Sequence, residues 1–596
     1  MQKINLDYSV NPFQKLFIEK GIELLYRNTI DSFRLRLHNP KTLIEELIQV
    51  TYSSISGILT NNDYVESTSK ELKQALEDNN DGLLYKQINK KHYLEILNKA
   101  DRNNYKLLIQ SSKLILKDNL GYDAHLFDEV NNLMNSYDSL IDSEGALTIK
   151  ESDFFSLRKK IVVFTNHLFV ELINKGYTKQ YLYNLFQIVF VRKKGHSKSF
   201  EERFNIYKEL AQKADEEFTV VFNIKGSTFQ FQEFYKIDNS YGLITKKFRK
   251  AIEKKTSNQV NEYLEKHKGE NLIYIKIHTK DYFKAIEIAL NRVSKDLDIY
   301  HLGFSKHIFR IDERCAVIGE NEPQKASTFP SNFQIDGYFR SDASIFENLL
   351  IKIKKIEQNN IGSESYNKIL SAIRYYRTGS ESPELETKLL NYWIGLEYIF
   401  TTTNSAEKTI DRIRKYFPKC HSLIYVKRNL FDYHKALSRQ EINGHISNYD
   451  DNLNYLLLHK SYRDVIVNSE SELLKFRTNF FQKWYEEPNK INEVLIKHQH
   501  NITSNITRLY RIRNEIVHNA AIKNGIYVHI SHIKYYLTFI LNSILDFMAE
   551  NNVDLDNDGK VTIEDYFIAQ EIILGSLKNS KLEEFLKINN PTQILH

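Results

Sequence analysis

The sequence predicts a mainly α-helical fold with a small α/β domain in the middle of the chain. Glycine (20) and proline (8) are scarce among the 596 residues, and a shortage of these helix breakers favours long helices. Apolar residues also recur at three- and four-residue spacing over most of the chain, which is typical of amphipathic helices. The chain is too long for a single core, so we expect several domains.

The first 215 residues are expected to form a helical N-terminal domain with a sensor or regulatory role. The segments with helical spacing are Pro12–Tyr26, Lys41–Ile58, His92–Leu97, Tyr105–Leu116, Lys159–Lys175 and Tyr181–Val191. Two polar stretches, Ser67–Asp81 and Ser136–Ser152, are expected to be exposed loops or helix ends.

The periodicity changes at about residue 216, where a small α/β domain (216–345) is expected. Phe218–Ile224 and Thr228–Phe234 are typical of the two arms of a β-hairpin, because the second arm alternates aromatic and polar residues. Further along we expect strands at Leu272–Ile277, Ile299–Leu302, Lys306–Ile311 and Arg314–Ile318, and a helix at Asp281–Lys295. The pattern leaves open whether the sheet is mixed or antiparallel.

Helices resume in a third domain, 346–550, followed by a helix-loop-helix at 551–577 and a C-terminal tail at 578–596. The expected helices of this domain are Ser344–Glu357, Ser363–Arg377, Leu385–Phe400, Thr409–Tyr416, Leu453–His459, Ser469–Tyr485, Lys490–Ala520 (with a break left open) and Ile530–Glu550.

Composition narrows the classes of function. The net charge of +6 is small for this length. It is compatible with contacts to phosphate groups but does not by itself predict a nucleic-acid-binding protein. The two cysteines exclude a disulfide framework and a cysteine zinc cluster. No apolar run approaches the roughly 20 residues of a membrane span, and the first residues lack the apolar core of an export signal. We therefore expect a cytoplasmic protein without membrane contact.

The segment Tyr510–Ala520 carries the residues best suited to catalysis. At about 100° per residue, Leu509, Ile512 and Ile516 form the stripe that faces the core. Arg511, Asn514 and His518 fall on the opposite face, so His518 is not expected to be a core histidine.

Arg513 is less well aligned with His518, because residues five apart diverge by about 140° on a regular helix. Its long side chain would have to bend round, or its functional partner would lie on another subunit. Arg511 is the alternative cation.

The string Arg513-Asn514-x-x-x-His518 resembles the signature of the HEPN superfamily, many of whose members are metal-independent ribonucleases. Upstream, Leu389–Phe400 resembles the opening helix of the Apea-like HEPN branch, with Trp393 and the pair Leu396-Glu397 at the matching places. The resemblance covers about 380–550. It implies a C-terminal HEPN-type helical bundle, an RNA substrate, no catalytic cofactor and a homodimer or higher oligomer.

In such a site the three residues would cleave RNA through its own 2′-hydroxyl. His518 would take the 2′-hydroxyl proton or protonate the departing 5′-oxygen. Arg513 would stabilise the charge on the phosphorane, and Asn514 would hold the imidazole or a phosphate oxygen, with Arg511 and Glu397 in support. One histidine cannot readily perform both proton steps, which the family resolves by bringing two helices together in a dimer.

By the same resemblance, the protein would act in anti-phage defence as an abortive-infection effector released by a phage-derived or protein trigger. Three alternatives remain open. The domain could be a non-catalytic dimeric scaffold that binds RNA or a protein, the enzyme could be a toxin held silent by a partner, or the motif could be coincidental.

A second motif follows at 554–565. Asp554, Asp556 and Asp558 occupy loop positions 1, 3 and 5, Gly559 position 6, the Lys560 carbonyl position 7, Thr562 position 9 and Asp565 position 12. This pattern resembles an EF-hand, with the aspartate at position 12 closest to the dockerin-type variant. It predicts a structural Ca²⁺ or Mg²⁺ site; the alternative is an acidic interhelical turn that binds no ion.

Overall fold

The structure, a computed structural model, describes residues 3–27, 38–59, 61–77, 80–143, 146–192, 198–226, 241–253, 255–303, 309–332, 335, 343–382, 384–402, 406–519, 526–550, 554–555 and 559–588. The chain divides into two compact units. One combines Met1–Glu171 with Ile335–His596, and the other is Leu172–Gln334. These units do not coincide with the predicted partition, because the N-terminal helices share a unit with the C-terminal ones and residues 172–215 group with the sheet.

The N-terminal part of the first unit is helical, and its first two helices begin at side-chain caps. Asn11 and Asn39 each accept a hydrogen bond from a backbone N–H of the following turn, and each precedes a proline, which suits the first helical position. The helices are α1 (Pro12–Leu25), α2 (Pro40–Ile55), α3 (Asp63–Glu77), α4 (Lys90–Asn98), α5 (Tyr105–Asp118), α6 (Tyr122–Asn135) and α7 (Glu151–Asn174).

Helix α3 corrects the prediction of an exposed loop at Ser67–Asp81. Its buried residues, which include Val65, Leu72 and Leu76, lie at spacings that place them on one face of a helix. The many polar residues between these buried positions make the helical periodicity difficult to recognise in the sequence. The face packs against α2, so burial decides the conformation of the segment.

The second unit is built on an antiparallel sheet with strand order β2-β3-β1-β4-β5. Alternate residues of β1 face opposite ways: Val220 and Phe222 pack with α13, while Val221 packs with α12. The elements are α8 (Lys179–Phe190), α9 (Phe200–Ala211), β1 (Glu216–Lys225), β2 (Gly242–Leu243), α11 (Lys246–Glu253), α12 (Asn258–Lys266), β3 (Leu272–Thr279), α13 (Tyr282–Gly303), β4 (Arg310–Gly319) and β5 (Ser327–Pro330).

Strand β1 pairs with β3 on one edge and with β4 on the other. The predicted hairpin arm Thr228–Phe234 lies outside the described residues, and one other prediction for this unit is wrong. The predicted strand Ile299–Leu302 is the last turn of α13. Leu297 and Tyr300 are buried there, so the helical spacing of the buried residues overrides a short apolar run.

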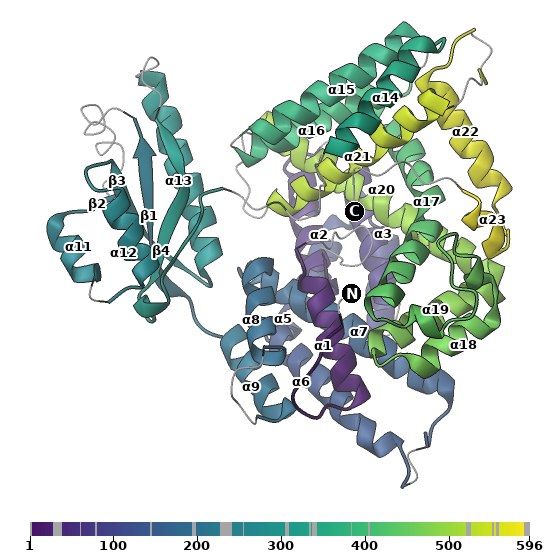
Figure 1. Ribbon diagram of the computed structural model, residues 1–596, viewed down its shortest axis with the longest axis horizontal. Coiled ribbons are helices and arrows are strands. Elements are labelled where there is room, and N and C mark those ends of the chain that lie inside the picture. The colour runs from purple at the N-terminus through teal and green to yellow at the C-terminus, as the bar shows by residue number, and fades with distance from the viewer. Residues whose placement is uncertain are drawn as a thin grey trace. The chain divides into compact units, whose positions relative to one another are not determined.

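The C-terminal part of the first unit follows the predicted helices, with longer bounds. The predicted Lys490–Ala520 is one helix, α20, through Asn519. The predicted helix Leu453–His459 is replaced by a short 3₁₀ turn, Asn454–Leu457, and His459 begins the next helix. The helices are α14 (Ala343–Gln358), α15 (Ser363–Glu381), α16 (Leu385–Phe400), α17 (Thr409–Arg439), α18 (His459–Asn468), α19 (Glu472–Glu486), α20 (Pro488–Asn519), α21 (Ile526–Glu550), α22 (Ile563–Ser576) and α23 (Leu582–Leu586) (Figure 1). Among the described helices, none has the length and apolar character required to cross a membrane.

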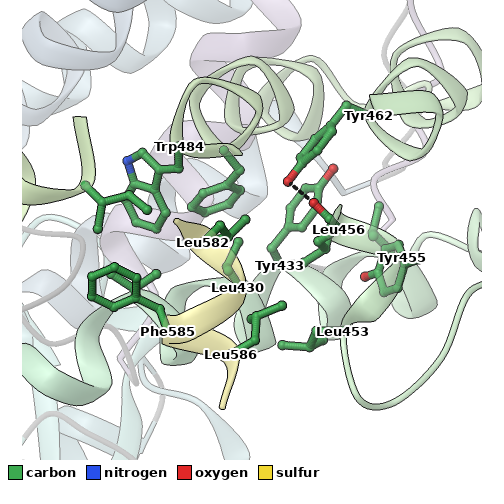
Figure 2. Packing of buried hydrophobic residues seen from close by; sticks show 14 of the residues in the cluster. Leu430, Tyr433, Leu453, Tyr455, Leu456, Tyr462, Trp484, Leu582, Phe585 and Leu586 are labelled. Carbon is green, nitrogen blue, oxygen red and sulfur yellow. Dashed lines mark hydrogen bonds between the residues drawn. The ribbon is translucent and has the colours of Figure 1, made fainter. Parts of the chain in front are cut away.

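A dense apolar cluster, here called the C-terminal core, holds α17, α18, α19 and α23 together (Figure 2). Leu430 and Tyr462 are fully buried in it, and Trp484 is 1% exposed. The hydroxyl of Tyr462 donates to the carbonyl of Leu456 at 2.7 Å. The ring is therefore buried while its hydroxyl keeps a hydrogen-bond partner.

Replacing Leu430 with alanine should lower the free energy of unfolding of this unit by about 2–5 kcal/mol, because it leaves a cavity in a packed core. Urea unfolding followed by tryptophan fluorescence measures it, since both tryptophans, Trp393 and Trp484, belong to this unit. Leu120→Ala is the matched control, because Leu120 is 81% exposed. Equal losses in the two variants would contradict the assignment of Leu430 to the core.

Candidate active site

Helix α20 presents its residues as the helical layout predicts. Leu509, Ile512 and Ile516 are 0%, 4% and 9% exposed, and they face the core. Asn514 is half-buried and His518 is exposed. The histidine is therefore placed where a ligand could reach it, not in the core.

Helices α16 and α20, which carry the two parts of the family resemblance, lie side by side although they are far apart in the sequence. Trp393 of α16 is fully buried, and its ring centroid is 5.6 Å from that of Tyr510. A turn further along α16, a carboxylate oxygen of Glu397 lies 3.8 Å from a guanidinium nitrogen of Arg513. The contact between the two aromatic rings thus holds α16 and α20 at a position where the carboxylate of Glu397 lies close to the guanidinium of Arg513.

Arg513 contacts the next residue of its own helix and a residue of α16. Its Nη1 donates to Oδ1 of Asn514 at 3.0 Å, while Nη2 faces Glu397. The structure therefore brings Glu397, Arg513 and Asn514 together. His518 lies one turn beyond Asn514 and is not part of this set of contacts.

Arg511 does not serve as the alternative cation. It is 7% exposed, and its guanidinium donates to the carboxylate of Glu46 in α2. Arg508, one turn earlier, donates to the same carboxylate from Nε, at 2.9 and 3.1 Å, and from Nη2 at 2.8 Å. Its Nη2 also donates to Glu71 of α3 at 2.6 Å. The prediction for Arg511 is corrected: the N-terminal helices bury this cation in an ion pair.

One feature of the sequence does predict a buried ion pair, although it was not used above. Glu46 lies between Leu43 and Val50 on the buried stripe of α2, and a carboxylate in that place has to find a cationic partner. The pattern gives no indication of which cation it finds, because Arg511 is 465 residues away. The hydroxyl of Tyr64 in α3 accepts a hydrogen bond from Nδ2 of Asn514 at 3.3 Å. Nothing in the sequence pattern predicts this contact.

The ion pair controls the charge of Glu46. Burial raises the pKa of this carboxyl, but the guanidinium groups of Arg508 and Arg511 outweigh burial and hold the pKa well below its usual range. The carboxylate therefore stays ionised, and it compensates two cations that have little access to water.

The calcium-type loop is described in part, since Asp556 and Asp558 lie outside the described residues. Gly559 has φ +83°, a conformation that favours glycine and that the loop pattern demands at this place. A carboxylate oxygen of Asp554 accepts from the backbone N–H of Gly559 at 2.7 Å. Asp565 is fully buried, where one oxygen accepts from the backbone N–H of Thr562 at 2.7 Å and from its hydroxyl at 2.9 Å.

The loop pairs with a different part of the chain rather than with a second loop of its kind. Val561 forms a parallel bridge with Ile361, in the connection between α14 and α15. The side chain of Asn360 also donates to the carbonyl of Gly559 at 2.6 Å. Within the described part of the loop, no group of three His, Cys, Asp or Glu side chains forms a metal site, and Lys560 is limited to its backbone carbonyl because its side chain is cationic.

Replacing Glu46 with glutamine should lower the free energy of unfolding by about 3 kcal/mol or more, because it leaves Arg508 and Arg511 buried and uncompensated. Glu45→Gln on the same helix is the control. We expect a change of about 1 kcal/mol or less, because Glu45 is half-buried and its carboxylate pairs with Lys41 near the surface.

The same ion pair predicts acid sensitivity. A carboxyl whose pKa is depressed on folding stabilises the protein above its unfolded pKa of about 4.3, and this contribution is lost as the pH falls through the folded pKa. The midpoint of urea unfolding should therefore fall less in acid for Glu46→Gln than for the wild type. Parallel pH profiles for the two proteins would contradict this account.

The candidate active site thus consists of an exposed histidine, a cation held between an amide and a carboxylate, and an N-terminal helix that touches the amide. No family model, no curated protein and no solved structure matches the chain.

Proposed function

We propose that this protein is a metal-independent endoribonuclease of HEPN type, with Arg513, Asn514 and His518 as its reacting residues. The observation that carries the proposal is the change in burial along one face of α20. Arg511 is locked in an ion pair, Asn514 is half-buried and His518 is exposed. The face therefore opens to solvent at the residues that the chemistry needs.

The contacts of Arg513 fit the role of binding a phosphate oxygen. A guanidinium has five N–H donors, and the described contacts engage one with Asn514 and place another near Glu397. The remaining donors are available to an anion, while the two partners fix the plane of the group. A planar cation fixed before the substrate arrives can stabilise the charge that develops on the phosphorane without reorganising.

His518 would supply the proton steps. As a neutral imidazole it can remove the proton of the 2′-hydroxyl, and as an imidazolium it can protonate the 5′-oxygen that leaves. Each α20 helix carries His518 once, so a two-fold dimer that joins two such faces would provide both forms at once. By the resemblance to Apea-like HEPN proteins, we extend the proposal to a role in anti-phage defence, with the activity released by a trigger.

The proposal predicts that the wild-type chain cleaves RNA in the presence of EDTA and that His518→Ala does not. The products should carry 2′,3′-cyclic phosphate ends, because the 2′-hydroxyl of the RNA is the nucleophile. The measurement is a cleavage assay on tRNA and mRNA, with end-group analysis of the fragments. His459→Ala is the control, since His459 is an exposed histidine on α18. Undiminished cleavage by His518→Ala would refute the assignment of this residue, and no cleavage by the wild type would favour the non-catalytic scaffold.

We also propose that the 554–565 loop binds a structural divalent cation, Ca²⁺ or Mg²⁺. The left-handed Gly559 and the pairing of Thr562 with Asp565 at the start of α22 support it. Asp554, the Lys560 carbonyl, Thr562 and Asp565 would provide oxygens to the ion, together with the predicted ligands Asp556 and Asp558. Its effect would be to fix α22, which Glu564 also ties to the buried Arg412 of α17.

Calorimetry should detect one Ca²⁺ bound per chain, and Asp554→Asn should weaken that binding by at least about tenfold, since a carboxylate is lost from a hard-cation site. The N-terminal acidic residue Asp7, also changed to asparagine, provides the control. The absence of binding by the wild type at millimolar Ca²⁺ would identify the loop as an ion-free turn.

A further inference from the structure

Helix α20 reaches the candidate active site while held by two N-terminal helices. Helix α3 packs against it, and the carboxylates of Glu46 in α2 and Glu71 in α3 both bind Arg508. Glu46 also binds Arg511, one turn before Asn514. These contacts fix the rotation of α20 about its axis immediately before the reacting residues.

The start of α3 is held independently of that ion pair. A carboxylate oxygen of Asp63 lies 3.7 Å from a guanidinium nitrogen of Arg414 in α17. The Nε of Arg414 in turn donates to the hydroxyl of Thr507 in α20 at 3.1 Å. Tyr64, the next residue of α3, is therefore placed by contacts on both sides, and it is 8% exposed.

The hydroxyl of Tyr64 completes a chain of side chains that crosses three helices. It runs from Glu397 of α16 through Arg513 and Asn514 of α20 to Tyr64 of α3. Arginine can only donate, so the oxygen of the Asn514 amide has to face Arg513. The amide nitrogen then points the other way, where it needs an acceptor, and the Tyr64 oxygen provides one at 3.3 Å.

We propose that Tyr64 is a positioning residue of the ribonuclease site, which acts through Asn514 to hold the guanidinium of Arg513 in place. The inference rests on the proposed function and adds to it. The N-terminal helices become a part of the active site rather than a separate sensor that could be removed without effect on the chemistry. Tyr64 does not bind the substrate, so its loss affects the reaction step and not the affinity for RNA.

The experiment measures kcat and KM of the full-length chain for cleavage of a single-stranded oligoribonucleotide in EDTA. Four proteins form a cycle: the wild type, Tyr64→Phe, Asn514→Ala and the double variant. Tyr64→Phe removes one oxygen and one hydrogen bond, so we expect kcat to fall roughly 3- to 10-fold with KM unchanged. In the Asn514→Ala background the same substitution should have no further effect on kcat, because the group through which Tyr64 acts is already absent.

Tyr93→Phe is the matched control for a general loss of stability. Tyr93 is fully buried in α4, and its hydroxyl shares a hydrogen bond of 2.8 Å with Ser112 at a place with no contact to Asn514. We expect its kcat to equal that of the wild type.

The possible results separate the two proposals. Cleavage by the wild type with an unchanged kcat in Tyr64→Phe would overturn the positioning role alone. An equal effect of Tyr64→Phe with and without the Asn514 side chain, or an equal loss in Tyr93→Phe, would also overturn it. No cleavage by any of the proteins would overturn the proposed function, and the role of Tyr64 with it.

Discussion

The first unit depends on one buried carboxylate, that of Glu46. It lies between the guanidinium groups of Arg508 and Arg511, and it joins the helices of the first eighty residues to the helix that carries the candidate active site. Burying charges is costly, and such an ion pair contributes little net stability compared with an apolar contact of the same size. It is specific, however, because few other arrangements of these helices would leave each charge compensated. The exposure of His518 and the orientation of Asn514 both follow from the position in which α20 is held.

Helices could be predicted where apolar residues recur at helical spacing, and the bounds of α16 and the end of α21 confirm this. The sequence was misleading where local composition and burial disagree. Ser67–Asp81 is polar in most positions, yet a few buried side chains make its first eleven residues, to Glu77, part of α3. Ile299–Leu302 has the composition of a strand, yet it continues α13. Strand pairing was harder still, since β1 receives its neighbours from distant segments rather than from the one that follows it.

The candidate active site was predictable to the extent that it is local. Spacing along a single helix placed Leu509, Ile512 and Ile516 in the core and His518 outside it. The same reasoning offered Arg511 as a free cation, because a helical layout shows which face a residue lies on and not what covers that face. Glu46 and Tyr64 cover it from more than 400 positions away, and a single sequence contains no distance between such segments.

The long separation of these partners also has a consequence for how the protein is made. Glu46 leaves the ribosome 465 residues before Arg511, which corresponds to about 25–90 s of synthesis at typical rates of about 5–20 residues per second. During that time α2 and α3 exist without the helix against which they pack, and the entire second unit is produced in between. The nascent chain therefore carries an unsatisfied acidic and apolar surface for much of its synthesis. The covering of this surface by α20 is therefore a late event in the maturation of the protein.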